Sequence, residues 1–198
     1  MLYNLQQGTH YYWFINPRNS AGIAAGCNSL VYTFDVDTNT TTANYCIPVY
    51  TNGGGTDIVA RVRVANIDYT SAGNVLPYYN YFSGVAAGNL YATSNYNLII
   101  NFGSDGPQFC AAWIDYNQDG QFNTTTEFLG NNAANAGANG NYTINFTVPA
   151  SALSGITRLR IRGGDDAALT SAMACGVSAS TYGQTEDYNV DIHFANRI

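Results

Sequence analysis

The sequence predicts an all-β fold, an antiparallel β-sandwich with a jelly-roll-like arrangement of strands. Sixteen Tyr and nine Phe residues favour strands over helices. Twenty Gly residues, with many Asn and Asp, supply turns. No segment shows the 3.6-residue apolar period of an amphipathic helix. Many short strands separated by frequent turns are typical of sandwiches and jelly rolls.

Segments after residue 57 have the patterns of strands. Residues 158–162 alternate strictly, which puts three arginines on one face and two aliphatic side chains on the other. Residues 109–115 are apolar around Trp113, as expected of a buried strand. The expected strands are 58–65, 97–102, 109–115, 142–148, 158–162 and 188–194.

The first 36 residues differ from the rest. Strands are expected at 11–15 and 29–34, with a turn at 16–22 between them. The matching residues are Leu5-x-x-Gly8-Thr9-x-Tyr11-Tyr12-Trp13, Asn19-x-x-Gly22 and Phe34. They resemble the last two strands of a fibronectin type III (immunoglobulin-like) domain. Two strands alone are not stable in water, so either a preceding part is missing or this hairpin packs on the next domain.

A polar segment without apolar periodicity follows this hairpin. We interpret residues 37–44 as a linker. The predicted organisation is therefore a partial fibronectin type III-like hairpin at 1–36, the linker at 37–44 and a β-sandwich domain at 45–198.

Composition and charge exclude several classes of partner. Charged residues make up only 10% of the chain, all seven basic residues are Arg, and the formal net charge is −6. Such a chain has no basic patch for a phosphate backbone, so we expect no nucleic-acid partner. No apolar run approaches the roughly 20 residues of a membrane span, so no membrane insertion is expected. Met1 is not followed by the pattern of a signal peptide, and a secreted form would be a mature piece or a fragment.

Four cysteines are spread along the chain without a C-x-x-C pair. An even number at wide spacing fits disulfides in an oxidising compartment rather than a zinc site. Four cysteines allow three pairings, and the residues alone leave all three open. The cysteines are Cys27, Cys46, Cys110 and Cys175.

Oxygen-bearing side chains recur at alternate positions after the strand that contains Trp113. A glycine follows them at Gly120 and permits a sharp turn. Calcium takes six to eight oxygen ligands, and an acidic turn of this type can wrap them around one centre. The spacing departs from the EF-hand, because no helices flank the loop and its last carboxylate comes one residue late. The expected calcium ligands are Asp115, Asn117, Asp119, Gln121 and Glu127; the alternative is an Asx-rich turn that hydrogen-bonds to itself.

Two adjacent carboxylates, Glu186 and Asp187, precede Tyr188 at the start of the last expected strand. In isolation they would be a solvated entry to the strand. They could also cap backbone amides or pair with the arginines of residues 158–162.

Taken in order, these motifs resemble the GEVED domain over residues 45–194. The matching residues are Tyr45-Cys46-x-Pro48, Trp113 to Gly120 with Phe122, Gly155-x-Thr157-Arg158-Leu159-Arg160, Cys175-Gly176 and Gly183-x-x-Glu186-Asp187-Tyr188. The motif departs from the family pattern at Gln184, where an acidic residue is expected.

The resemblance to the GEVED domain implies a β-sandwich with an accessory role. Members occur mostly in large secreted and surface proteins of Bacteroidota and related bacteria, and many are exported by the type IX route. The resemblance also implies a disulfide between Cys46 and Cys175. Cys27 would then have lost its partner with the missing strands, or would bond to Cys110.

No catalytic constellation is present in the sequence. His10 and His193 lie far apart and are expected to be surface or packing residues, and no nucleophile motif occurs. We therefore expect no enzyme. The predicted function is a calcium-stabilised extracellular or cell-surface module of a larger secreted adhesin, surface or filament protein. Its expected partners are neighbouring domains or subunits of that protein.

The alternative function is a carbohydrate-binding accessory module of a secreted enzyme. Exposed aromatic rings stack on sugars, and Tyr78, Tyr79 and Tyr81 could supply such a platform for glycans. The competing interpretation is that these rings fill the core, since aromatic side chains dominate cores and strands.

Overall fold

The structure is a computed structural model of the 198-residue chain. It describes residues 10–13, 18–20, 22–23, 32–35, 44–73, 76–176 and 181–194. The chain divides into two compact units, Met1–Thr42 and Ala43–Ile198. The boundary falls inside the predicted linker 37–44, of which all but Asn44 lies outside the described residues.

The described residues of the first unit form two pairs of short strands. β1 (His10–Trp13) pairs antiparallel with β4 (Tyr32–Asp35), and β2 (Arg18–Asn19) pairs antiparallel with β3 (Gly22–Ile23). β1 and β4 overlap the strands expected at 11–15 and 29–34. Cys27 lies outside the described residues. The origin of this hairpin in a fibronectin type III-like domain stays a prediction.

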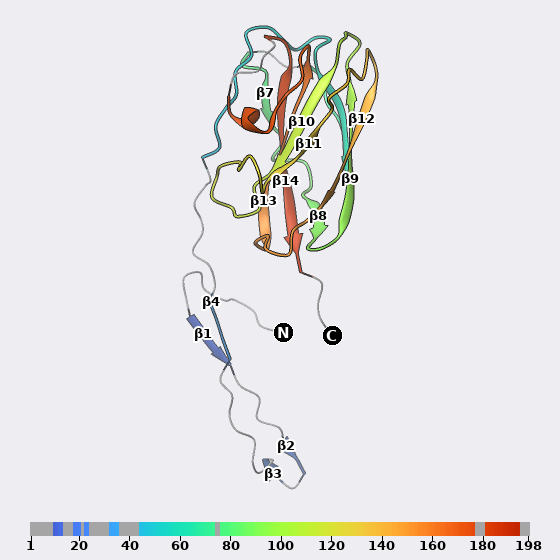
Figure 1. Cartoon of the computed structure of the whole chain (residues 1–198). Helices are drawn as coiled ribbons and strands as arrows, with labels where there is room; N and C mark the ends of the chain where they lie inside the picture. Colours follow the sequence, from blue (N-terminus) through green and yellow to red (C-terminus); the bar gives the residue numbers. More distant parts are fainter. Residues whose placement is uncertain are drawn as a thin grey trace. The chain divides into compact units, whose positions relative to one another are not determined.

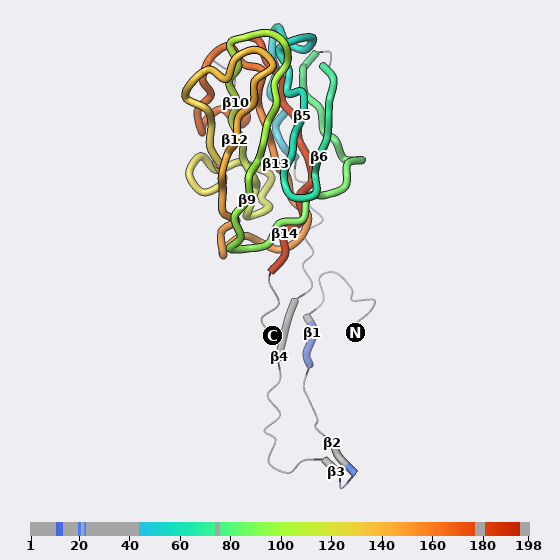
Figure 2. The backbone as a smooth tube through the Cα atoms, turned by 90° about the vertical axis from the view of Figure 1, so that its right-hand side faces the viewer, coloured from blue at the N-terminus to red at the C-terminus, as the bar shows by residue number. Residues whose placement is uncertain are grey.

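The second unit is a β-sandwich, which confirms the predicted fold class (Figure 1). In the first sheet the order is β11-β10-β13-β14-β7, with β8 also paired to β14. In the second sheet the order is β12-β9-β5-β6, and Figure 2 shows these strands side by side. The first sheet consists of β7 (Tyr79–Tyr81), β8 (Gly88–Tyr91), β10 (Phe109–Ile114), β11 (Phe128–Asn131), β13 (Gly155–Asp165) and β14 (Gln184–His193). The second consists of β5 (Val59–Val64), β6 (Ile67–Thr70), β9 (Asn95–Phe102) and β12 (Asn141–Thr147).

The main core lies between the two sheets. β13 contributes Leu159 and Ile161, and β9 contributes Leu98 and Ile100, all fully buried. Because successive side chains of a strand point to opposite faces, the arginines of β13 lie on the outer face of the first sheet. The alternation in residues 158–162 predicted this division correctly.

A second, smaller apolar cluster lies on that outer face around Trp113. The indole N–H of Trp113 donates to the carbonyl of Ser171, 3.0 Å away, in the short 3-10 helix η1 (Ser171–Ala174). The outer face of the first sheet is therefore covered by irregular segments and not by a third sheet. No helix in the described parts of the chain is both long and apolar enough to cross a membrane.

β14 has strand partners on both sides. It pairs antiparallel with β13 along nearly its whole length, from Gln184↔Gly163 to Ile192↔Gly155. On its other side it pairs in parallel with β7 and, further along, with β8. The sandwich is thus antiparallel except at this edge, where the two short parallel pairings were not predicted.

Candidate functional site: an acidic loop and an arginine ladder

The acidic loop joins β10 to β11 and begins at Asp115, whose side chain is completely buried. Its Oδ1 accepts from the backbone amide of Asp119 at 3.2 Å, and its Oδ2 accepts from that of Gly120 at 3.0 Å. The hydroxyl of Tyr45 donates to the same Oδ2 at 2.6 Å. Gly120 has φ of +83°, a conformation that glycine adopts without strain. The loop therefore wraps its backbone around the Asp115 carboxylate.

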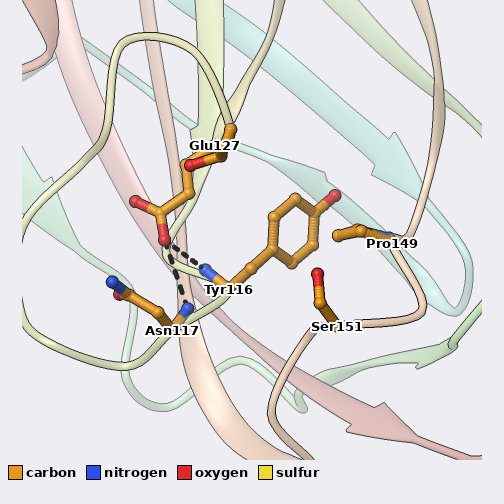
Figure 3. A pocket seen from close by; sticks show the side chains of 6 residues that line it. Tyr116, Asn117, Glu127, Pro149 and Ser151 are labelled. Carbon is orange, nitrogen blue, oxygen red and sulfur yellow. Dashed lines mark hydrogen bonds between the residues drawn. The ribbon is translucent and has the colours of Figure 1, made fainter.

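Glu127 closes the other end of the acidic loop and is only 2% exposed. Its Oε1 accepts from the amides of Tyr116 and Asn117 at 3.0 and 3.2 Å (Figure 3). Its Oε2 accepts from the amide of Asn123 at 2.7 Å. Burial raises the pKa of Glu127; the amide hydrogen bonds partly offset this, and the charges of Asp115 and Asp119 raise the pKa further. Three carboxylates therefore interact electrostatically within one loop.

A cavity of about 500 Å³ adjoins Glu127. Figure 3 shows the ring of Tyr116 between Glu127 on one side and Pro149 and Ser151 on the other. The carboxylate of Glu127 is directed at the backbone amides of Tyr116 and Asn117. Its oxygens are thus engaged in holding the loop.

The predicted calcium ligands are of the type that calcium prefers, but most of their side-chain oxygens accept hydrogen bonds within the loop. Asp115, Asn117 and Asp119 do place hard oxygens around one turn, as calcium requires. However, Asp115 and Glu127 bind amides of their own loop, and the amide of Gln121 donates to Asp119 at 2.8 Å. Within the described residues, no three His, Cys, Asp or Glu side chains form a group that could hold a metal ion. The conformation is that of the self-hydrogen-bonded turn, and calcium stays a prediction.

An arginine ladder, defined as Arg158, Arg160 and Arg162 of β13, crosses the outer face of the first sheet. Arg160 is completely buried, and its Nε and Nη2 each lie 2.8 Å from an oxygen of Asp187. Its remaining N–H groups donate to the carbonyls of Cys46 and Ala174 at 2.7 and 2.9 Å. A bidentate, fully satisfied guanidinium of this kind is one of the stronger polar interactions in proteins.

The other two members of the arginine ladder bind aromatic residues. Arg162 is also completely buried; its Nε donates to the hydroxyl of Tyr50 at 2.8 Å, and its guanidinium lies 4.7 Å from the centre of that ring. The guanidinium of Arg158 lies 4.4 Å from the ring centre of Tyr45 and 3.6 Å from that of Tyr81. Such cation–π contacts strengthen when they are desolvated.

The two adjacent carboxylates of β14 point to opposite faces and are both completely buried. Asp187 faces the arginine ladder and pairs with Arg160, which confirms the predicted alternative of pairing with the arginines of residues 158–162. Glu186 faces the interior between the sheets, where Ser71, Gln184 and Tyr188 donate to it. Burial raises the pKa of Glu186 to about 7. A solvated strand entry is therefore wrong for both residues.

The tyrosines proposed as a glycan platform do not form a free row of rings. The hydroxyl of Tyr79 donates to Asp187 at 2.8 Å, and Tyr81, although 41% exposed, has Arg158 stacked against it. Tyr78 is half-buried, and its carbonyl accepts from the amide of Thr185 at 2.8 Å. Tyr79 and Tyr81 thus contact the arginine ladder and its partner Asp187.

A disulfide joins Cys46 to Cys175, the pairing that the family resemblance implies. The thiol of Cys110 is buried in the main core and free. Burial raises the pKa of this thiol to about 12, so it stays protonated at neutral pH.

Residues 109–191 match the family model of the GEVED domain. The chain contains a GEVED domain. The matched segment runs from the start of β10 to Asp191 in β14, so it includes the acidic loop, the arginine ladder and both buried carboxylates. GEVED domains are a non-enzymatic, accessory type of domain. No curated protein matches the chain.

Sequence reasoning missed the residues that bind the arginine ladder from outside the GEVED match. Tyr45 and Tyr50 precede the matched segment and make two of the ladder's aromatic contacts, with Arg158 and Arg162. The sequence contains one indication of their importance, the Tyr45-Cys46-x-Pro48 pattern of the family resemblance. That pattern does not reveal which residues Tyr45 contacts. Asn132 was also missed; it is 1% exposed, and its side chain bonds the backbone of Cys110 and Gln108.

Proposed function

We propose that this GEVED domain is a non-catalytic structural module of a larger secreted adhesin, surface or filament protein. The observation that carries the proposal is that charged residues of the family motifs are buried and bonded within the unit instead of facing a binding site. Arg160, Asp187 and Glu186 are completely buried, and each is bonded to other groups of the same unit. A catalytic site needs titratable groups aimed at a space that a substrate can enter. Here the charged groups stabilise the sandwich.

Its setting in an oxidising compartment outside the cell is supported by the disulfide. Disulfides persist in secreted and surface proteins and are rare in the cytosol. Cys46 and Cys175 are separated by 129 residues, so their bond closes a long loop of the unfolded chain. Neighbouring domains or subunits of the same surface protein are the proposed partners, and the type IX route is the proposed path of export.

Calcium bound at the acidic loop is the finer part of the proposal. Its support is electrostatic: Asp115 and Asp119 both repel the charge of Glu127, and a divalent cation would relieve that repulsion. Asp115, Asn117 and Asp119 would hold the ion by side-chain oxygens, with Gln121 and Glu127 as the remaining proposed ligands. Binding only to the folded form raises stability, on the order of 2.7 kcal/mol at a hundredfold excess over Kd.

The test is a thermal melt of the oxidised protein in calcium and in EGTA. We expect calcium to raise the melting temperature of the wild-type protein, and we expect the Asp119→Ala substitution to abolish most of that rise. Asp68→Ala is the matched control, because Asp68 lies on the exposed side of the second sheet and pairs with Arg61. The same melting temperature in both buffers would contradict calcium binding and leave the hydrogen-bonded turn as the loop's stabiliser.

The carbohydrate-binding alternative has weaker support. Of the three proposed platform residues only Tyr81 is exposed, and one of its faces is taken by Arg158. A single ring is a poor platform. Titration with oligosaccharides while following tyrosine fluorescence would restore this alternative if it gave saturable binding that Tyr81→Ala removed.

A further inference from the structure

A strap, defined as residues 44–50, crosses the outer face of the first sheet without belonging to any strand. Its side chains alternate in exposure: Ile47 and Val49 are each 57% exposed, whereas Pro48 and Tyr50 are buried. Near its end, the backbone amide of Tyr50 donates to the carbonyl of Pro77 at 3.3 Å, and that of Asn52 donates to the carbonyl of Thr181 at 2.8 Å. The strap is therefore held mainly by side chains and by the disulfide.

Each arginine of the ladder binds one strap residue. Tyr45 lies against Arg158, the carbonyl of Cys46 accepts from Arg160, and the hydroxyl of Tyr50 accepts from Arg162. The disulfide sits in the middle of this series. The strap thus covers two completely buried guanidinium groups, and one covalent bond fastens it.

The two sulfurs of the disulfide have different surroundings. Nη1 of Arg160 lies 2.9 Å from Sγ of Cys46 and 3.9 Å from Sγ of Cys175. Cys175 is exposed and Cys46 is half-buried. In thiol–disulfide exchange the accessible sulfur is attacked, and the sulfur that is more stable as a thiolate leaves faster. A cation beside a sulfur stabilises its thiolate.

We propose that the Cys46–Cys175 disulfide is a redox-responsive fastener of the strap, polarised by Arg160 so that an external thiol attacks Cys175 and Cys46 departs. The attacking thiolate forms a bond to Sγ of Cys175, the bond between the two cysteines breaks, and its electron pair stays on Sγ of Cys46 beside the Arg160 guanidinium. A second external thiolate then attacks the mixed disulfide and frees Cys175. The external reductant, a small thiol or dithiol, is oxidised to its own disulfide, and the protein disulfide gains two electrons and two protons.

Opening the fastener has a defined structural consequence. The strap loses its covalent attachment, so Tyr45 and Tyr50 can leave Arg158 and Arg162, and the cationic outer face of β13 becomes accessible. β13 itself keeps its ladder of hydrogen bonds to β10 and β14. Reduction is therefore expected to act locally on the strap.

The direction of exchange is tested on the folded protein with reduced glutathione. A Cys27→Ser variant leaves the disulfide pair and Cys110 as its cysteines, and the buried Cys110 stays protonated and inert. The reaction is stopped early with iodoacetamide and the peptides are mapped by mass spectrometry. We expect glutathione on Cys175 and the alkyl group on Cys46, in at least about tenfold excess over the reverse. Equal labelling, or glutathione mainly on Cys46, would overturn the polarity.

Release of the strap is tested by hydrogen exchange of the oxidised and reduced protein. The amides of Tyr50 and Asn52 are expected to exchange about tenfold faster or more after reduction, while that of Leu159 in β13 stays protected. A Cys46→Ser, Cys175→Ser variant should match the reduced protein under either condition. Unchanged exchange at Tyr50 and Asn52 would refute the fastener, and so would equal acceleration at Leu159, because that would mean global unfolding.

Discussion

At the scale of single residues, Glu186 and Asp187 show how neighbours in sequence acquire opposite roles. Both are completely buried, yet one faces the space between the sheets and the other faces the arginine ladder. Gln184 stands where the family pattern has an acidic residue, and its amide donates to Glu186. A carboxyl group at that position would place a second acidic group beside the buried one, whereas the amide of Gln184 supplies a hydrogen-bond donor.

The raised pKa of Glu186 predicts a pH dependence of stability. Because burial raises its pKa from 4.5 to about 7, the folded protein keeps a proton that the unfolded chain loses. The contribution of Glu186 to the free energy of unfolding is therefore fully present below about pH 4.5 and is lost as the pH rises through about 7, a fall of about 3 kcal/mol.

Glu186→Gln removes the titrating group and should flatten that fall. Urea unfolding at pH 4.5 and pH 7.5 measures the difference. Asp68→Asn, an exposed carboxylate of the second sheet, should leave the fall in place. If Glu186→Gln kept the full pH dependence of the unchanged protein, other carboxyl groups would be its source.

Sequence alternation indicated the faces of β13 but not the burial of its arginines. A strict period of two separates two faces, and it carries no information on what covers the outer one. The cover comes from residues more than 100 positions away, since Cys46 and Tyr50 bind Arg160 and Arg162. Asp115 shows the same limit: its spacing marked a loop rich in oxygens, while the structure shows those oxygens accepting amides of the loop.

At the scale of elements, the pairing between β13 and β14 contains the buried, bidentate ion pair of Arg160 with Asp187. Arg160→Met would leave Asp187 with Arg158, 3.0 Å away, and the hydroxyl of Tyr79, and would leave the carbonyls of Cys46 and Ala174 without this donor. Breaking a buried ion pair from one side costs about 3–5 kcal/mol. Chemical denaturation should show a loss of this size.

A double-mutant cycle separates the pair from the packing of each side chain. Arg160→Met with Asp187→Leu should lose much less stability than the sum of the two single changes, since neither Arg160 nor Asp187 is then left buried without the other. Arg61→Met is the control, because the Arg61–Asp68 pair is exposed and such pairs contribute little. Additive losses would mean that the two side chains act independently.

In the second unit, the strands found by sequence are those long enough to show a pattern. β5, β9, β10, β12, β13 and β14 have six to eleven residues, and each overlaps an expected strand. β6, β7, β8 and β11 have only three or four residues and were missed. A segment of that length shows at most two inward positions, which cannot be told from a turn.

At the scale of the whole molecule, the two apolar clusters belong to the second unit. Their described members lie between Tyr45 and Ile192, and all strands that enclose them lie in the same range. We therefore predict that deletion of residues 1–42 changes the melting temperature of the sandwich by only a few degrees, a shift that corresponds to about 1 kcal/mol. Calorimetry of the shortened and full chains checks this. A large drop in the melting temperature would show that the sandwich depends on the first unit.

The central position of β14 determines when the sandwich can form during synthesis. β14 is the last strand of the unit to leave the ribosome, yet β13 on one side and β7 and β8 on the other are joined only through it. Until residue 193 has emerged, the edge of β13 stays open and β7 and β8 have no partner in the sheet. Domains generally fold as units while the chain is being made, and unpaired strand edges are prone to aggregation. For this domain, the period in which unpaired strand edges are open to aggregation lasts almost until its translation is complete.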